Sequence, residues 1–126
     1  MNNPFEIQGQ NEIRGIDITQ EFLENISNCQ QRIEKVIASA PVVLFMKGNS
    51  VMPQCGFSAN SSAILAHCGC TFHTYNILND PDLRAQLKEF SNWPTFPQLY
   101  INGEFIGGND ILTEMFEQGE LQKLLS

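Results

Sequence analysis

The apolar run Val42–Met46 constrains the fold of this 126-residue chain more than any other feature. A strand buried on one face alternates apolar and polar residues, whereas this run is apolar at every position. Continuous runs of this kind are typical of strands that helices cover on both faces of a sheet. The run therefore predicts a central strand at residues 42–46 of an α/β fold.

The segments after this strand alternate between helical and strand patterns. Asp80-Pro81 indicates a helix start, because Asp caps a helix and Pro fits its first turn. Asn102-Gly103 is a strong hairpin signal. The expected elements are helix 55–67, strand 71–77, a helix from residue 80, strands 99–101 and 104–106, a helix from residue 110 and a short helix 120–125. A right-handed crossover between two parallel strands and a C-terminal hairpin give a four-stranded mixed sheet with helices on both faces.

The N-terminal part of the chain has a weaker pattern. Residues 1–16 are rich in Asn, Gln, Glu and Gly without a period, which predicts a mobile tail. Beyond Asp17, apolar residues recur at alternating steps of four and three, which is typical of one helix face: Phe22, Ile26, Cys29, Ile33 and Val36. Competing capping patterns allow a helix over 18–39 or a break near residue 26. We therefore divide the chain into an N-terminal extension, partly disordered or helical, at 1–25 and a domain at 26–126.

The segment Lys47–Ser58 places one cysteine, Cys55, after the central strand and at the expected start of a helix. Unpaired backbone N–H groups and the positive end of the helix dipole lower the pKa of a thiol there, and Lys47 adds to the effect. Ser58 occupies the position at which a Cys-x-x-Cys motif has its second thiol. The site therefore has one thiol.

The composition argues against several classes of partner and location. The chain has 14 acidic and 7 basic residues, a net charge of −7 and no basic run, which argues against nucleic acid or an anionic membrane. No apolar stretch approaches the roughly 20 residues of a membrane span. Four irregularly spaced cysteines and an N-terminus without a secretory signal indicate a reducing compartment. We expect a cytoplasmic location of the bacterial type, or an organelle matrix if a leader was removed.

Three motifs lie in loops that this order of elements brings together: Cys55-Gly-Phe-Ser58, Trp93-Pro-Thr-Phe-Pro97 and Gly107-Gly-Asn-Asp110. In this order and spacing, over about residues 26–125, they closely resemble the monothiol glutaredoxins, whose hallmark is Cys-Gly-Phe-Ser. The resemblance implies a thioredoxin fold. It also implies a site for glutathione, a tripeptide with two carboxylates, an amine and a thiol.

The resemblance assigns glutathione-binding roles to residues in and around these motifs. Lys47 would bind the glycyl carboxylate, and Arg84 would add a second cation unless it is an ordinary solvated helix residue. The segment Thr95-Phe96-Pro97 would hold a cis peptide bond before Pro97, and its backbone would pair with glutathione like an added strand. Trp93 would brace this turn. Phe57 would either cover the thiolate or pack in the core.

The glycine pair and the helix start after it would hold the γ-glutamyl end of glutathione. Gly108 lets the backbone approach a ligand, and the N–H groups of Asn109 and Asp110 suit a carboxylate. Asp110 would also pair with the ammonium group, or would cap the helix without a ligand. Family members often carry Cys or Ser where this chain has Asn109, which argues against a disulfide between this position and Cys55.

The other cysteines are expected to be structural. Cys68-Gly-Cys70, beside His67, looks like part of a metal knuckle, but structural zinc needs four ligands and no second pair follows. We expect Cys68 to be buried at a helix end, Cys70 to be an adventitious thiol that departs from the family, and Cys29 to lie in the core.

The family resemblance implies one main function and leaves alternatives. The first is binding and transfer of a [2Fe–2S] cluster, with Cys55 as the metal ligand, in iron–sulfur protein biogenesis or iron regulation. Four thiolate ligands then require a homodimer bridged by the cluster and two glutathiones. The expected partners are a BolA-like protein and apo iron–sulfur client proteins.

The second function is a glutathione-dependent thiol–disulfide oxidoreductase with Cys55 as the catalytic thiol, for which one thiol suffices. We expect this activity to be weak, because the long loop Gly48–Gln54 would hinder a second glutathione. A non-catalytic adaptor, with Cys55 as a remnant, is the least favoured hypothesis.

Overall fold

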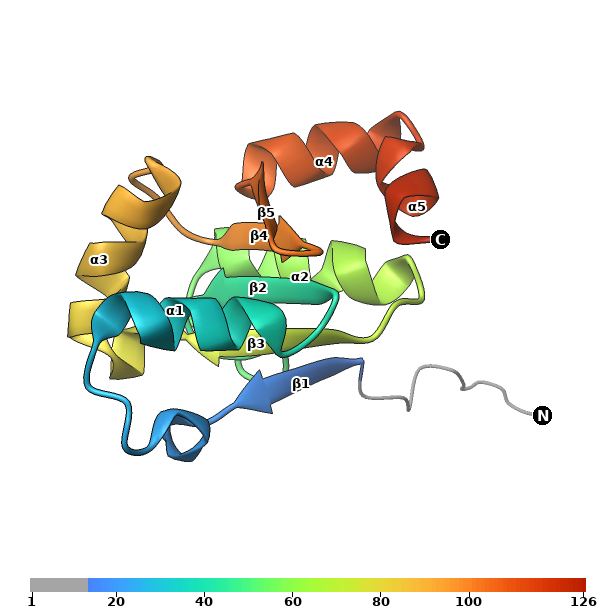
Figure 1. The fold of residues 1–126 in the computed structure, drawn as a ribbon. Coiled ribbons are helices and arrows are strands. Elements are labelled where there is room, and N and C mark those ends of the chain that lie inside the picture. The colour runs from blue at the N-terminus through green and yellow to red at the C-terminus, as the bar shows by residue number, and fades with distance from the viewer. Residues whose placement is uncertain (1–13) are drawn as a thin grey trace.

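The structure is a computed structural model that describes residues 14–126, so most of the predicted tail lies outside the described residues. Its centre is a sheet of β1 (Gly15–Ile18), β2 (Val42–Met46), β3 (Phe72–Asn76), β4 (Gln98–Ile101) and β5 (Glu104–Gly107). The helices are α1 (Cys29–Ala38), α2 (Gly56–His67), α3 (Pro81–Ser91), α4 (Asn109–Glu117) and α5 (Glu120–Leu125). Short 3-10 helices at Gln20–Leu23 and Ile77–Asn79 complete the described chain (Figure 1).

The strand order in the sheet is β1-β3-β2-β4-β5. β2 runs parallel to β3, with Leu44 opposite Thr74, and antiparallel to β4, with Leu44 opposite Leu99. β4 and β5 form the hairpin predicted at Asn102-Gly103. The mixed sheet of a thioredoxin fold is confirmed, with one strand more than predicted.

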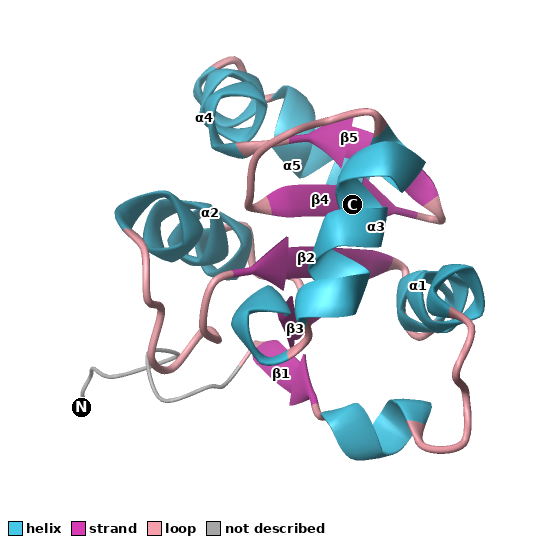
Figure 2. Cartoon of the chain, turned by 90° about the vertical axis from the view of Figure 1, so that its left-hand side faces the viewer, coloured by secondary structure: helices cyan, strands magenta, loops and turns pink. Residues whose placement is uncertain are grey.

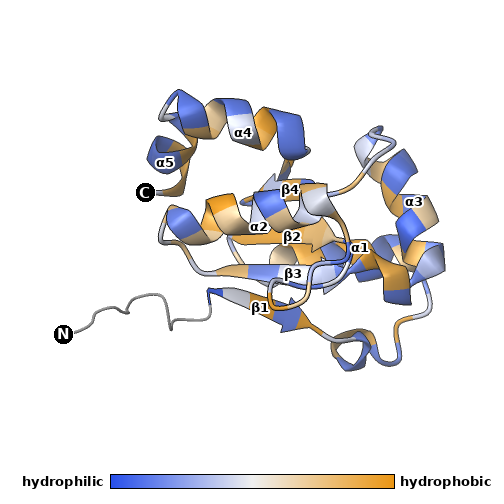
Figure 3. Ribbon diagram, turned by 180° about the vertical axis from the view of Figure 1, so that it is seen from behind, coloured by the Kyte–Doolittle hydropathy of each residue, from blue (hydrophilic) through white to orange (hydrophobic). Residues whose placement is uncertain are grey.

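Helices cover both faces of the sheet, which Figure 2 shows nearly edge-on. The core cluster beneath α1 and α3 contains Val43 and Phe45 of β2. The cluster beneath α2, α4 and α5 contains Val42, Leu44 and Met46. Because successive residues of β2 point into opposite clusters, the whole strand is buried and hydrophobic, as predicted (Figure 3).

The additional strand, β1, joins the edge of the sheet beside β3. The two strands run parallel, with Gly15 opposite Phe72, and Thr74 Oγ1 donates a hydrogen bond to Asp17 Oδ1 at 3.1 Å. The sequence Gly-Ile-Asp-Ile is short and contains two residue types that strands disfavour. The prediction of a mobile tail over residues 1–16 is therefore wrong at Gly15 and Ile16. The division of the chain into an N-terminal extension at 1–25 and a domain at 26–126 stays a prediction.

A single helix over 18–39 is wrong, and the alternative with a break near residue 26 is closer. The 3-10 helix ends at Leu23, and α1 begins after Asn28, whose side chain accepts a backbone N–H of the first turn at 2.9 Å. Leu23 is fully buried among core residues, whereas Phe22 is 39% exposed. The periodic pattern misses this because it continues across an irregular segment.

Asp80 fixes the start of α3, as predicted. Its carboxylate accepts hydrogen bonds from the Leu83 N–H and from the Tyr75 hydroxyl at 2.7 Å, and it pairs with Arg32 of α1. These partners offset the cost of burying a charge. The network joins α1, β3 and α3 and thereby sets the position of Arg84. Within the described residues, no helix is long and apolar enough to cross a membrane.

Candidate functional site

A cavity of about 450 Å³ opens where β2 ends and α2 begins. Its lining comes from the three predicted motifs, from α3 and from the residue that follows β2: Lys47, Cys55, Phe57, Arg84, Lys88, Trp93, Pro94, Thr95, Phe96, Gly108, Asn109 and Asp110. Of the predicted site residues, Pro97 alone is not in the lining, and it is buried next to Phe96. A larger hollow of about 630 Å³ lies near the end of α1 and the β4–β5 turn, but neither a cysteine nor a cation lines it. We therefore take the smaller cavity as the candidate site.

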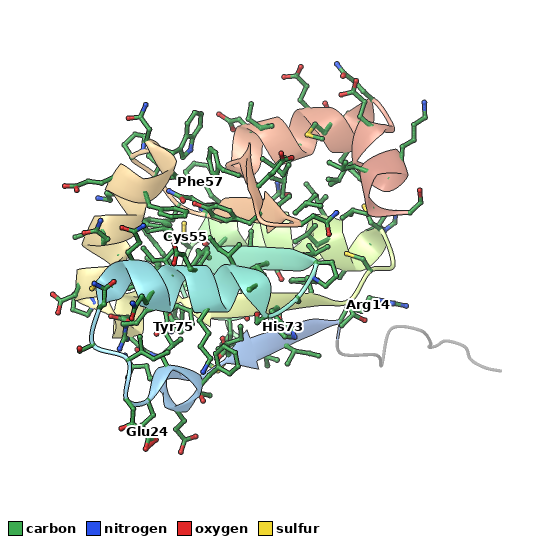
Figure 4. All side chains as sticks on the ribbon, viewed as in Figure 1. Arg14, Glu24, Cys55, Phe57, His73 and Tyr75 are labelled. Carbon is green, nitrogen blue, oxygen red and sulfur yellow. The ribbon has the colours of Figure 1, made fainter. Side chains whose placement is uncertain are left out.

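Cys55 is the N-cap residue of α2 and is partly exposed at the cavity (Figure 4). The side chain makes no capping hydrogen bond. The pKa of its thiol is nevertheless lowered, mainly by the backbone N–H of Ser58 and further by the N–H of Phe57, the charge of Lys47 and the Ser58 hydroxyl. Partial burial opposes this shift without reversing it. Cys55 is therefore ionised at a lower pH than an ordinary cysteine, as expected for a thiol at a helix start.

Ser58 joins the end of β2 to the start of α2. It is fully buried, and its Oγ accepts the backbone N–H of Lys47 at 3.0 Å. This contact leaves the hydroxyl proton available for the Cys55 thiolate. The buried Ser58 side chain thus helps to fix the position of Lys47 relative to Cys55.

The loop between Lys47 and Cys55 folds back on itself. The Gln54 N–H donates a hydrogen bond to the Lys47 carbonyl at 2.8 Å. Gly48 has a φ of +88°, and a Cβ there would lie 2.5 Å from the carbonyl oxygen of Met52. Only glycine fits this position without a clash, so the loop geometry depends on Gly48.

Three cationic side chains line the cavity, namely Lys47, Arg84 and Lys88. In the described part of the chain, none of the three pairs with a carboxylate, and Arg84 Nε is buried without a hydrogen-bond partner. The motifs do not predict a role for Lys88, although it lies four residues after Arg84 and therefore on the same helix face. Because Arg84 is partly buried at the cavity, it is not an ordinary solvated residue. These cations suit a ligand with carboxylates.

Gln98 supports the Trp93–Pro97 loop from the buried start of β4. Its Nε2 donates hydrogen bonds to the carbonyls of Trp93 at 3.1 Å and Thr95 at 3.2 Å. The peptide bond before Pro97 is cis, as the family resemblance implied. Trp93 packs against an aromatic ring of β5 and also lines the cavity, and its role in bracing the turn stays a prediction. The role of Gln98 was not predicted, because its partners are identified only by the fold.

Gly108 lies where the start of α4 approaches the Trp93 loop. A Cβ on Gly108 would lie 3.1 Å from Trp93 Nε1 and 3.2 Å from the Pro97 carbonyl oxygen. Asn109 Oδ1 accepts hydrogen bonds from Ser61 Oγ and from another α2 side chain, both at 2.9 Å. The Asn109 side chain is thus bound to α2, while the first N–H groups of α4 have no intrahelical partner.

Phe57 is 62% exposed, so a core position is excluded and the residue lies at the cavity rim. The predictions that Cys68 is buried and that Cys29 lies in the core are wrong, because both are partly exposed at helix ends. Burial raises the pKa of the Cys68 and Cys70 thiols. Among the described residues, no three ligating side chains gather to hold a metal ion.

The fold and the site define a thioredoxin-fold protein with a single thiol at the cavity. A family model described as Glutaredoxin matches residues 42–106. The uncharacterized monothiol glutaredoxin ycf64-like of Synechocystis sp. is 50% identical over 94 residues, which cover 75% of this chain and 88% of that protein. Glutaredoxin 4 of Escherichia coli is 48% identical over 100 residues, which cover 79% and 87%.

Solved structures give the same result. Reduced poplar apo GrxS14 superposes with a TM-score of 0.69 at 50% identity, covering 78% of this chain and 90% of that one. A buckwheat glutaredoxin in complex with glutathione superposes with a TM-score of 0.68 at 25% identity, covering 86% and 94%. The chain belongs to the glutaredoxin family, as a monothiol member with Cys-Gly-Phe-Ser at residues 55–58.

Proposed function

We propose that this glutaredoxin binds a [2Fe–2S] cluster with the help of glutathione and transfers it to apo proteins. The observation that carries the proposal is that Cys55 is the one cysteine of the described chain that lines the cavity. Cluster iron needs four ligands and prefers thiolate sulfur. One chain with one glutathione supplies two thiolates, so two chains and two glutathiones complete the set.

The charges of the cavity support glutathione as the second thiol. Lys47 and Arg84 would bind the glycyl carboxylate, and the backbone of Phe96 would pair with the peptide. The N–H groups of Asn109 and Asp110 would bind the γ-glutamyl carboxylate, and the Asp110 carboxylate would bind its ammonium group. The buckwheat relative, which is a glutathione complex, supports the same ligand for this chain.

The proposed assembly is a homodimer bridged by the cluster, in which a BolA-like protein can replace one subunit. Exposed apolar side chains near Cys55 in the sequence support a contact between chains: Val51 is 73%, Met52 66% and Phe57 62% exposed. Two of the four cluster ligands are then exchangeable tripeptides. Such a cluster suits release to apo iron–sulfur client proteins.

The lowered pKa of Cys55 favours a second candidate function, the removal of glutathione from protein thiols. The Cys55 thiolate would attack the glutathione sulfur of a mixed disulfide and release the protein thiol. A second glutathione thiolate would then attack the glutathionylated Cys55, release its thiolate and leave as glutathione disulfide. No second protein thiol is needed in this route.

Anaerobic reconstitution with iron, sulfide and glutathione tests the main proposal. Visible absorption reports the cluster, and gel filtration reports the oligomeric state. The variants are Cys55→Ser and, as a matched control, Cys29→Ser at the start of α1. We expect a coloured dimer that requires both glutathione and Cys55 and that persists in Cys29→Ser.

The opposite result is equally clear. A colourless monomer that still removes glutathione from a glutathionylated peptide would refute the cluster carrier and establish the oxidoreductase. Colour that persists in Cys55→Ser would refute Cys55 as the ligand.

A further inference from the structure

The turn Cys68-Gly69-Cys70 holds a pair of cysteines that the proposed function does not use. It lies at the C-terminal end of α2, whereas Cys55 caps the N-terminal end. The helix has 12 residues and is therefore about 18 Å long. The chemistry of this pair is thus independent of the cavity.

The backbone between the two cysteines bends in a way that suits ring closure. Cys68 has helical dihedral angles as the C-cap of α2, and Gly69 has a φ of +81°. A disulfide requires Cα atoms roughly 4–7 Å apart, and a bend at the middle residue brings the flanking Cα atoms closer than an extended chain would. A Cβ on Gly69 would meet nothing within 4 Å, so the turn has room to adjust.

The two cysteine side chains share one environment. Both cysteines pack at the edge of the core cluster beneath α2 and α4. Burial raises the pKa of Cys70, and the nearby thiolate charge of Cys68 raises it further. Cys70 Sγ donates a hydrogen bond to the Leu65 carbonyl at 3.5 Å, and because a thiol is a weak donor this bond can be given up on reaction. Both thiols are free in this structure.

Arg14 gives the turn a positive neighbour. Its Nη1 donates a hydrogen bond to the Gly69 carbonyl at 2.7 Å, and its charge favours the Cys70 thiolate. An arginine beside a thiol promotes attack on disulfides, because the thiolate is the nucleophile. This neighbour comes from the segment just before β1, which the sequence patterns did not place here.

We propose that Cys68 and Cys70 form a second redox site, a dithiol that glutathione disulfide oxidises to an intramolecular disulfide. One thiolate attacks a sulfur of glutathione disulfide, forms a mixed disulfide and releases one glutathione thiolate. The other thiolate attacks the protein sulfur of the mixed disulfide, closes the Cys68–Cys70 bond and releases the second glutathione. The two thiol protons pass to the released glutathiones, so two protein thiols are oxidised and one glutathione disulfide is reduced.

The test uses the full chain carrying Cys55→Ser, so that its result does not depend on the proposed function. The protein is incubated with glutathione disulfide at mildly alkaline pH, because the pKa values of both thiols are raised. After acid quenching and alkylation, mass spectrometry follows the peptide that contains residues 68–70. Three further variants add Cys68→Ser, Cys70→Ser or, as a control, Cys29→Ser.

We expect most of the parent to lose two hydrogen atoms on this peptide without retaining glutathione. At least one of the Cys68→Ser and Cys70→Ser variants should instead trap one glutathione, and the parent should retain at least about tenfold less, because the neighbouring thiol has a high effective concentration. The Cys29→Ser control should behave as the parent. Glutathione retained by the parent to within about tenfold of the trapping variant, an unreacted pair, or a disulfide to Cys29 or to another chain would each overturn the proposal.

Discussion

Replacing Lys47 by alanine tests whether the cationic side of the cavity recognises a carboxylate of glutathione. Lys47 follows the last residue of β2, and its backbone is held by Ser58, so the substitution removes the charge without removing this anchor. Two other cations, Arg84 and Lys88, remain in the cavity. The expected loss of glutathione binding free energy is therefore that of one charge pair, and the rest of the site still binds.

The magnitude follows from the partial exposure of Lys47. Two unit charges about 4 Å apart attract by about 1 kcal/mol in water and about 4 kcal/mol at the effective dielectric constant of a protein surface. Because solvent screens a partly exposed pair, we expect a loss of about 2 kcal/mol, which corresponds to about 30-fold weaker binding. The loss should shrink as the salt concentration rises.

Calorimetric titration of reduced glutathione into the Cys55→Ser chain measures this effect without formation of a mixed disulfide at that position. Lys123→Ala, at an exposed position of α5, is the matched control because it removes the same charge outside the cavity. If Lys47→Ala at low salt binds within about threefold of this control, the carboxylate assignment is refuted.

Three further predictions concern the thiols, the loop support and the N-terminal segment. Alkylation followed by mass spectrometry should show that, as the pH falls, Cys55 stays reactive to a lower pH than Cys68, because the pKa of the Cys55 thiol is lowered and that of the Cys68 thiol is raised. Coincident pH profiles of alkylation for the two cysteines would contradict this. Gln98→Leu should weaken glutathione binding by about tenfold and lower stability by about 2 kcal/mol, because the carbonyls of the Trp93 loop lose their buried donor; unchanged calorimetric binding would show that the loop needs no such support. Leu23→Ala should destabilise the chain by about 3 kcal/mol in urea, because Leu23 is fully buried; a loss below about 1 kcal/mol would mean that its surroundings collapse around the smaller side chain.

The elements around the site could be predicted because their signals are local. The apolar run of β2, the Asp80-Pro81 cap and the Asn102-Gly103 turn each act within a few residues, and each occurs as expected. β1 could not be predicted, because its pairing depends on β3, more than 50 residues away in the chain. The anchoring contacts of Gln98 and Asn109 have the same cause, since their partners are set by the packing and not by the spacing of residues.

The pairing of β1 with β3 also determines how the chain can be shortened. A fragment that begins at residue 26 would lack β1 and Leu23, and β3 would become the edge of the sheet. Its sequence Phe-His-Thr-Tyr-Asn is rich in residues that favour strands, and an uncovered edge of this kind is a template for pairing with another chain. β1 covers this edge with a shorter strand that carries Asp17, so a chain that begins at residue 26 should pair with other chains through β3 more readily than the longer chain does.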